Sequence, residues 1–135
     1  MMNGEYSATT RDIRVSVRSF YLTDQSNPDE HKFVWAYRIR IDNTGAETVQ
    51  LLRRSWEITD STGHTLRVEG PGVVGEQPVL DPGESFEYTS GTPLETASGF
   101  MVGRYQMQVS GTGETFDVAI PAFSLDSPHQ DSRLH

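Results

Sequence analysis

The chain has 135 residues, no cysteine and a formal net charge of −8. This length predicts one domain that buries a core without disulfides, and the lack of cysteine excludes a thiol nucleophile, a Cys-ligated zinc site and an iron–sulfur cluster. The acidic balance argues against nucleic acid as a partner, because phosphate binding is driven by clustered Lys and Arg.

Positive charge is concentrated in the first half of the chain. Residues 1–67 carry nine basic and nine acidic side chains, whereas residues 68–135 carry two basic and ten acidic ones. Arg38 and Arg40 alternate with apolar residues, so both project from the polar face of one strand, and Arg14 and Arg18 do the same on an earlier strand. Such arginines form an anion-binding patch or, more simply, a solvated sheet face with dispersed ion pairs.

Targeting signals are absent from the sequence as given. The first seven residues contain neither the basic segment nor the apolar segment of a secretory leader, and no apolar run in the sequence approaches membrane-spanning length. We therefore expect a cytoplasmic protein with no membrane insertion.

The first predicted elements have period 2. Residues 1–10 are expected to be a flexible N-terminus, and clean alternation begins at residues 13–18. A long strand follows a polar loop at residues 23–30, and one of its faces carries five large residues: Phe33, Trp35, Tyr37, Ile39 and Ile41. Residues 42–45 are predicted to form a tight turn in which Gly45 takes positive φ.

The return strand contains a change of phase. Val49 and Leu51 are odd-numbered apolar positions, whereas Leu52, Trp56 and Ile58 are even-numbered. Because side chains alternate along a strand, this change predicts a β-bulge near residues 51–52. The next turn is predicted at residues 60–63, before a short strand that leads into a glycine-rich loop.

The second half of the sequence shows the same pattern of alternating runs separated by turns. Turn signals at residues 81–84, 91–99 and 110–113 separate further alternating runs. Seven or more short strands joined by turns predict an all-β fold, an antiparallel β-sandwich over residues 11–125. Residues 126–135 have little to bury and are expected to be a flexible C-terminal tail.

The glycine-rich loop is the main candidate site. Its glycines, Gly70, Gly72 and Gly75, have the G-x-G-x-x-G spacing of nucleotide-binding loops. Residues 78–83 contain two prolines and a glycine, so the helix whose N-terminus binds the diphosphate cannot follow. The loop is therefore either a tight structural connection or an anion site without a helix. Because acidic residues such as Glu76 surround it, a diphosphate there would need a bridging cation or Arg67 brought close, and we take Arg67 and Glu76 with the three glycines as the suspected ligand-binding residues.

The residues around this loop resemble those of the bacterial ApaG family. The resemblance rests on residues 49–60 and 72–91, with further matches at Gly99, at residues 103–107 and at residues 116–123. It covers about residues 8–125. Ser55 departs from the pattern, since the family has histidine before Trp56, and any role of that histidine is lost here.

Resemblance to ApaG implies a fibronectin type III-like β-sandwich and an association with cobalt and magnesium efflux or resistance. Similar domains in eukaryotic F-box proteins and in a DNA-polymerase-interacting protein imply a role in binding other proteins. No catalytic residue, metal ligand or cofactor comes with the family. We therefore predict a non-enzymatic interaction module with a protein partner; the alternative is a protein that binds pyrophosphate or a nucleotide with Mg²⁺, or a weak diphosphate hydrolase using Glu76 or Asp81.

Other candidates are weaker. Residues 29–31 (Asp-Glu-His) offer ligands to a divalent cation, but consecutive residues of an extended loop point in different directions. His64 beside a predicted turn is most simply an exposed hairpin residue. Phe100 and Val102 fall out of phase with Met101 and are expected to be exposed, where they would suit a protein partner.

Overall fold

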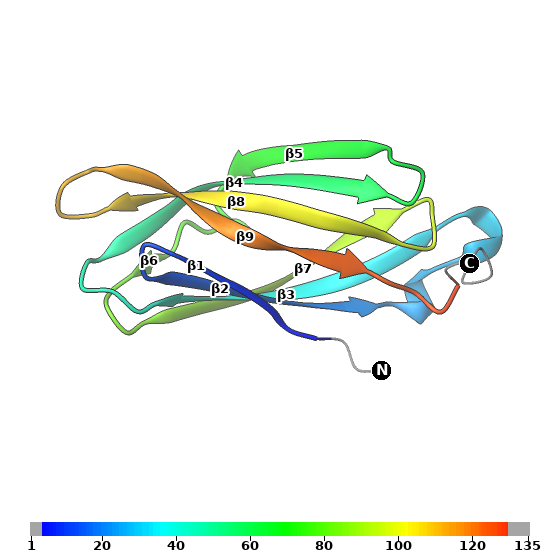
Figure 1. The fold of residues 1–135 in the computed structure, drawn as a ribbon, viewed down its shortest axis with the longest axis horizontal. Helices are drawn as coiled ribbons and strands as arrows, with labels where there is room; N and C mark the ends of the chain where they lie inside the picture. Colours follow the sequence, from blue (N-terminus) through cyan, green and yellow to red (C-terminus); the bar gives the residue numbers. More distant parts are fainter. Residues whose placement is uncertain (1–3, 130–135) are drawn as a thin grey trace.

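The computed structural model describes residues 4–129, which form two packed β-sheets (Figure 1). No helix in this part of the chain is long and apolar enough to span a membrane. The strands in chain order are β1 (Tyr6–Thr10), β2 (Ile13–Tyr21), β3 (Phe33–Asn43), β4 (Val49–Asp60), β5 (Thr65–Pro71), β6 (Val79–Leu80), β7 (Ser85–Leu94), β8 (Gly99–Val109) and β9 (Thr115–Leu125). Two 3-10 turns, η1 (Thr23–Gln25) and η2 (Pro28–Glu30), lie between β2 and β3.

The two sheets confirm the predicted antiparallel β-sandwich. One sheet has the order β1-β2-β3-β7, and the other has the order β5-β4-β8-β9, with β6 also paired to β4. Every strand pairing is antiparallel. Strands β2, β3 and β7 facing β9, β8, β4 and β5 give the fibronectin type III-like arrangement, and β1 extends the first sheet by one strand.

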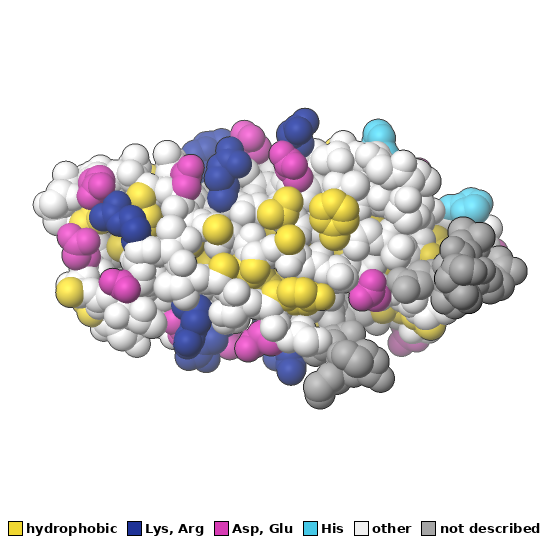
Figure 2. All heavy atoms as spheres, viewed as in Figure 1, with side chains coloured by type: hydrophobic (Ala, Val, Ile, Leu, Met, Phe, Trp, Pro, Cys, Tyr) yellow, Lys and Arg dark blue, Asp and Glu magenta, His cyan; other side chains and the backbone are white. Residues whose placement is uncertain are grey.

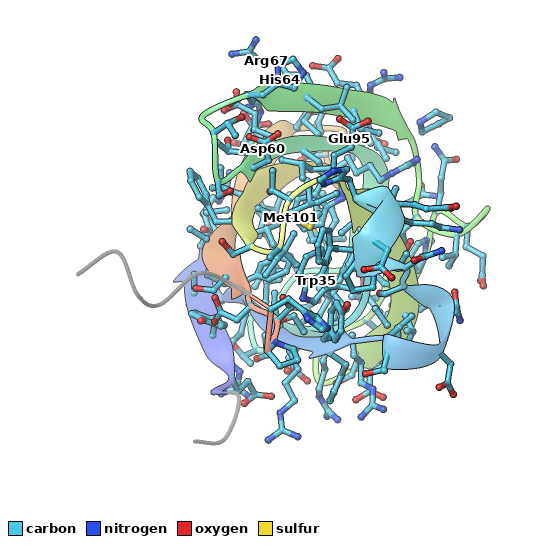
Figure 3. The ribbon with its side chains drawn as sticks, turned by 90° about the vertical axis from the view of Figure 1, so that its right-hand side faces the viewer. Trp35, Asp60, His64, Arg67, Glu95 and Met101 are labelled. Atoms are coloured by element: carbon cyan, nitrogen blue, oxygen red, sulfur yellow. The ribbon has the colours of Figure 1, made fainter. Side chains whose placement is uncertain are left out.

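The core lies between the sheets and follows the predicted alternation. All five large residues on one face of β3 are buried: Phe33, Trp35, Tyr37, Ile39 and Ile41. Trp35 from one sheet and Met101 from the other are fully buried and lie in the interior between the sheets (Figure 3). Burial of these inward faces is the main source of stability for such a sandwich.

The predicted bulge in the return strand is confirmed. The pairing of β4 with β8 shifts register between Leu51 and Arg53. Val49 and Leu51 are buried before the shift, and Trp56 and Ile58 are buried after it. The shift therefore puts Arg54, in phase with Trp56, on the face of β4 that looks toward the other sheet.

The turn after β3 differs from the prediction. Gly45 does not adopt positive φ, unlike Gly63 and Gly83 in two other predicted turns. Instead the side chain of Asn43 organises this connection: its amide donates to the carbonyl oxygens of Glu47 (2.7 Å) and Leu80 (3.0 Å), and its own oxygen accepts the Gly45 N–H (3.0 Å). A buried amide satisfies backbone groups that the predicted glycine turn would have left to water.

The N-terminus is more ordered than expected. Residues 6–10, which fall within the predicted flexible segment, form β1 and pair with β2. Arg11 and Asp12 close this hairpin with positive φ at both positions, which is the geometry of a two-residue β-hairpin turn. The prediction missed it because neither residue is the usual glycine or asparagine.

The first residues of the predicted C-terminal tail pack against the domain. Trp35 Nε1 donates to the Asp126 carbonyl oxygen (2.8 Å), and Ser127 Oγ donates to the Ala97 carbonyl oxygen (2.6 Å). The His129 ring lies near Tyr21 and Phe33. Residues 126–129 therefore belong to the folded part, whereas residues 130–135 and 1–3 lie outside the described residues.

The two long sides of the sandwich differ. On one side β9 lies against β1 and β2 (Figure 1), where Tyr6 OH donates to Ser124 Oγ (3.4 Å) and Arg11 pairs with Glu114 (3.0 Å). On the other side β5 and β7 are the last strands of their sheets, and β5 and β7 are not paired with each other. This second side, called the open side below, carries the candidate site.

Candidate functional site

The glycine-rich loop forms a tight turn at one end of the open side. Val73 and Glu76 exchange two backbone hydrogen bonds of 2.8 Å each. Between them Val74 has φ 44° and Gly75 has φ 82°, which defines the two-residue turn type that favours glycine and asparagine. A β-branched residue at positive φ is a genuine outlier, so Val74 holds strained backbone.

The backbone of the loop is largely engaged within the chain. The N–H of Gly72 donates to the Leu52 carbonyl oxygen (2.9 Å), in addition to the two bonds that close the turn. A Cβ at position 72, where φ is 62°, would overlap the Glu76 carbonyl oxygen. The motif therefore has a structural role at Gly72, and of the turn residues only Val74 and Gly75 keep N–H groups with no partner among residues 4–129.

Gly70 has a different role, because it makes room for Arg54. The backbone of Gly70 has no positive φ, and a Cβ there would lie 3.1 Å from Nη1 of Arg54. That nitrogen donates to the carbonyl oxygens of Pro71 (3.1 Å) and Gly72 (2.9 Å). The guanidinium of Arg54 is thus fixed against the loop by the loop's own backbone.

The arginine that contacts this loop is Arg54 and not the predicted Arg67. Arg67 lies on the outer face of the sheet, where its Nε is 3.2 Å from a carboxylate oxygen of Glu57. Arg54 is half-buried and has no carboxylate partner among the described residues. A positive charge withdrawn from water without a counter-ion is costly, and the carbonyl oxygens of Pro71 and Gly72 offset only part of that cost.

Arg54 faces a pocket of about 320 Å³ between the two sheets, called the Arg54 pocket. Strands β3, β4 and β7 and the glycine turn line it with Tyr37, Arg54, Trp56, Pro71, Val73, Val74, Gly75, Tyr88 and Ser90. The hydroxyl of Tyr88, which lines the pocket, is hydrogen-bonded to that of Tyr105 at 2.5 Å. The pocket therefore combines one cation with hydroxyl groups and an apolar wall, a composition typical of ligand sites.

Burial controls the ionisation of these tyrosines. It raises the pKa of Tyr37, Tyr88 and Tyr105 above the ordinary value for a phenol, and the nearby charge of Arg54 opposes this only weakly. All three hydroxyls are protonated at neutral pH, and those of Tyr88 and Tyr105 are bonded to each other. A protonated phenol beside a guanidinium suits an anionic group better than it suits base catalysis.

The carboxylates near the loop are not gathered around it. Asp81 Oδ1 accepts a hydrogen bond from Thr48 (2.8 Å), and Glu84 Oε1 accepts one from the backbone N–H of Asp81 (2.8 Å), so both serve the turn before β7. Glu76 is exposed at the edge of the glycine turn. Of the residues assigned to a diphosphate site, the loop brings together Gly72, Gly75 and Glu76, while Arg67 points elsewhere.

A second hollow of about 510 Å³ lies farther along the open side, and we call it the Leu66 hollow. It is lined by Glu30, His31, Lys32, Ile58, Asp60, His64, Leu66, Pro93, Leu94 and Glu95. Glu30 and His31 of the Asp-Glu-His segment thus meet His64 there, whereas Asp29 is not part of the lining. Figure 3 shows Asp60, His64 and Glu95 at this end of the molecule.

The polar groups of the Leu66 hollow do not assemble a metal site. Asp60 Oδ1 accepts hydrogen bonds from Thr62 N, Thr62 Oγ1 and His64 N. These bonds, chiefly the one from the Thr62 hydroxyl, hold the pKa of the Asp60 carboxyl below its usual value. Among residues 4–129, no group of three or more His, Cys, Asp or Glu side chains is arranged to hold an ion. Asp60 is therefore a turn residue, and His64 is exposed as expected.

The outer face of the second sheet carries a further hollow of about 490 Å³, lined among others by Ser55, Trp56 and Gly103. Ser55 is the position that departs from the ApaG pattern. Phe100 is 47% exposed, as predicted, whereas Val102 is half-buried and so less exposed than predicted. On the face of the molecule shown in Figure 2, apolar side chains run along the middle, and basic and acidic side chains are interspersed nearer the edges.

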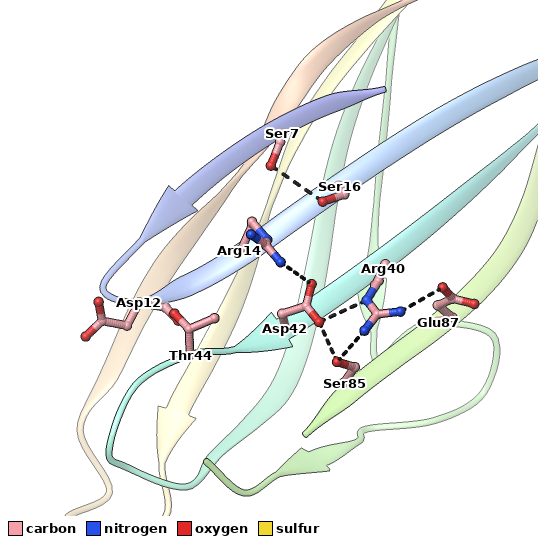
Figure 4. Close-up of polar contacts among 9 residues, drawn as sticks. All are labelled: Ser7, Asp12, Arg14, Ser16, Arg40, Asp42, Thr44, Ser85 and Glu87. Carbon is pink, nitrogen blue, oxygen red and sulfur yellow. Dashed lines mark hydrogen bonds and ion pairs between the residues drawn. The ribbon is translucent and has the colours of Figure 1, made fainter. Parts of the chain in front are cut away.

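The predicted arginine-rich face of the first sheet is neutralised in part: Arg14 and Arg40 have carboxylate partners, whereas Arg18 and Arg38 form no ion pair with a described residue. Asp42 accepts hydrogen bonds from Ser85 and from Arg40 (2.9 Å) and lies 3.5 Å from Arg14, and Arg40 also reaches Glu87 (3.5 Å) (Figure 4). Burial acts to raise the pKa of Asp42, but the bonds and charges of its partners outweigh it and hold the pKa below its usual value. This cluster is a network of ion pairs, as the simpler reading expects.

Arg54 is the residue that sequence reasoning missed. The signal was present, because the bulge near residues 51–52 puts even-numbered positions on the core side, and Arg54 stands between Leu52 and Trp56 in that phase. An arginine at an inward position of a strand is unusual and indicates a special environment. The tyrosines that face it come from strands distant in sequence, which periodicity cannot bring together.

Comparisons with known proteins agree on one family. A model of the "ApaG domain" matches residues 23–109. The chain is 65% identical over 130 residues to "Protein ApaG" of Paramagnetospirillum magneticum, covering 96% of this chain and 99% of that protein, and 66% identical over 128 residues to "Protein ApaG" of Rhodospirillum centenum, covering 95% and 98%. The crystal structure of the "Putative ApaA Protein" from Bordetella pertussis has a TM-score of 0.84 and 45% identity, and the match covers 88% of this chain and 96% of that one. The domain match, the sequence identity over nearly the full length and the shared fold lead to one conclusion: the chain belongs to the ApaG family.

Proposed function

We propose that this protein is a non-enzymatic binding module that holds an anionic group of a partner in the Arg54 pocket. The observation that carries the proposal is the half-buried Arg54 guanidinium, which has no carboxylate partner among residues 4–129 and faces a cavity of about 320 Å³. A ligand oxyanion would complete this site. Carboxylate and phosphate are the groups that a guanidinium binds best.

The hydroxyl groups of the pocket support the same reading. Tyr37 and Ser90, whose side chains are hydrogen-bonded to each other, line the cavity together with Arg54. Both lining tyrosines, Tyr37 and Tyr88, are protonated at neutral pH, and burial raises their pKa further, so they place no negative charge in the pocket that would repel an oxyanion. The net effect is a local positive site on a protein whose overall charge is −8.

The chemistry of the lining favours binding over turnover. Among the described residues that line the Arg54 pocket there is no carboxylate and no imidazole. Hydrolysis of a diphosphate needs a group that activates water, and protonated tyrosines with raised pKa values are poor bases. We therefore expect no turnover of pyrophosphate or nucleotides by this protein.

A second candidate function remains, the binding of pyrophosphate or a nucleotide by the glycine turn. It is favoured by the N–H groups of Val74 and Gly75, which have no partner among the described residues, beside the exposed carboxylate of Glu76. The acidic surroundings require a bridging cation, so this candidate predicts binding that depends on Mg²⁺ and falls in Glu76→Gln.

One titration tests both candidates. Backbone-amide NMR spectra are recorded during addition of succinate or pyrophosphate, each with and without Mg²⁺. We expect shifts at Val74, Gly75 and Ser90 with both anions and without Mg²⁺, and affinity reduced by about tenfold or more in Arg54→Met, since charge-assisted hydrogen bonds are lost. The adjacent exposed Arg53→Met is the matched control and should bind as the wild type does.

The other outcomes are equally clear. Unchanged spectra with both anions up to high millimolar concentrations would remove the anion-binding proposal. Shifts confined to pyrophosphate with Mg²⁺ would favour the glycine-turn candidate. The cytoplasmic location and the link to cobalt and magnesium efflux stay predictions, and within this proposal the link acts through the partner that the module binds.

A further inference from the structure

We propose that the partner is an extended peptide segment that adds a strand to the free edge of β7, with an acidic side chain in the Arg54 pocket. This inference rests on the proposed function and specifies its ligand. Three features support this inference: β7 has a free edge, two hollows lie beside it at a defined spacing, and an exposed apolar residue lines each hollow.

The edge of β7 is available for pairing. β7 pairs with β3 on one side only, over ten register positions from Ser85 to Leu94. Every second residue of an edge strand turns its N–H and C=O groups outward, where another strand can pair with them. On the opposite side of the sandwich β1 and β9 lie against each other, so that side offers less room.

β7 also lacks most of the features that block such pairing. Natural edges are protected by proline, by bulges or by lysine. In β7 the pairing with β3 runs without a register shift, and the first proline is Pro93, next to the last residue of the strand. The other edge on this side, β5, is shorter and ends at Pro71. β7 is therefore the better template.

Two hollows follow one another along β7. The Arg54 pocket includes Tyr88 and Ser90, and the Leu66 hollow includes Pro93 and Leu94. Ser90 and Leu94 are four residues apart on the same face of the strand, which corresponds to about 13 Å in an extended chain. A paired peptide would place two of its own side chains, four positions apart, in the two hollows.

The chemistry of the hollows defines these two side chains. Arg54 without a counter-ion selects a carboxylate at one position. Ile58, Leu66 and Leu94 make the second hollow the more apolar one and select an aliphatic or aromatic side chain. The recognised segment is thus an extended run with Asp or Glu at one position and an apolar residue four positions away.

Two exposed apolar residues lie over this path. Leu66 is 57% exposed at the Leu66 hollow, and Val74 is 54% exposed at the Arg54 pocket. Val74 is also held at positive φ, a conformation that persists where the surroundings or a function require it. Both side chains would be covered by a strand lying along β7.

The test begins with a displayed library of random linear heptapeptides selected against the full-length chain. We expect enriched peptides to carry Asp or Glu four positions from an apolar residue. Synthetic copies should slow hydrogen exchange at outward amides of β7 and should bind Arg54→Met about tenfold or more weakly than Arg53→Met. Leu66→Ser should weaken binding more than Val79→Ser, which removes a similarly exposed apolar side chain, 51% exposed, away from both hollows.

A matched pair of N-methylated peptides isolates the strand pairing. Methylation of every second amide leaves the side chains unchanged but removes the donors on one edge of the peptide. One of the two alternating patterns should abolish binding and the other should preserve it. Equal binding of both patterns would overturn the added strand.

The remaining outcomes distinguish this inference from the proposed function. Succinate shifts at the Arg54 pocket without any selected peptide would overturn the peptide and leave the anion site standing. Loss of both would overturn both. Concentration-dependent dimerisation through β7, measured by sedimentation, would overturn the peptide partner in favour of a second copy of this chain.

Discussion

Gly72 and Gly75 lie three residues apart in the glycine-rich loop and have different surroundings. Both have positive φ, yet a Cβ at Gly72 would overlap the Glu76 carbonyl oxygen, whereas a Cβ at Gly75 meets nothing within 4 Å. Gly75→Ala should therefore cost only the backbone penalty, about 1–2 kcal/mol. Gly72→Ala should cost clearly more, because the turn must also open.

Urea denaturation of the two variants and of Gly111→Ala, where a Cβ meets nothing and φ is not positive, measures this difference. Equal losses at positions 72 and 75 would show that the overlap is relieved without cost.

Asp42 couples stability to pH at the outer face of the first sheet. Its pKa is lower in the folded state than in the unfolded chain, so its contribution is present above the unfolded pKa and is lost as the pH falls through the folded pKa. Asp42→Asn should lower the free energy of unfolding at pH 7 by about 1–3 kcal/mol. The difference in the free energy of unfolding between the wild type and Asp42→Asn should become smaller as the pH falls below the ordinary pKa range of Asp.

Denaturation of both proteins across pH 3–7 checks this expectation. Asp117→Asn is the control, since its 3.8 Å pair with Arg104 is largely exposed, and exposed pairs contribute little. A constant gap between wild type and Asp42→Asn at all pH values would contradict the linkage.

At the scale of elements, β1 links the two sheets. It extends the first sheet beside β2, and it also lies against β9 of the second sheet. Removal of residues 1–10 should therefore lower stability by at least about 2 kcal/mol, because burial of the Tyr6 ring is lost and the edge of β2 is exposed. Thermal and urea unfolding of the truncated chain, compared with a chain lacking residues 1–4, checks this; unchanged stability would mean that β1 is dispensable.

The bulge in β4 is the element that creates the candidate site. Without the register shift between Leu51 and Arg53, Arg54 would face solvent and Arg53 would face the core. One inserted residue thus turns an ordinary surface arginine into the cation of a pocket. Bulges are frequent beside functional sites for this reason.

At the scale of the whole molecule, the sequence predicted more of the fold than of the site. Alternation along β3 and the phase change in β4 are local signals, and both were correct. The hairpin at Arg11 and Asp12 was missed because its turn residues are atypical. The pocket was missed because Arg54, Tyr37 and Tyr88 become neighbours only when the two sheets pack, and no spacing in the chain records that contact.

The sandwich is also asymmetric across its width. β9 covers one side through contacts with β1 and β2, while β5 and β7 leave the other side unpaired. Both proposals place their ligand on this unpaired side. A partner bound there would contact both sheets at once, so binding and the packing of the two sheets should be coupled.

Trp56 lines the Arg54 pocket on one face of its sheet and the outer hollow beside Gly103 on the other. The chain has only two tryptophans, and the second, Trp35, is fully buried and bonded to Asp126 near the far end. Trp35→Phe therefore leaves a single indole in the lining of the pocket, and we expect its emission to change when a ligand binds there. The molecule carries its own optical probe at the place where a ligand is expected.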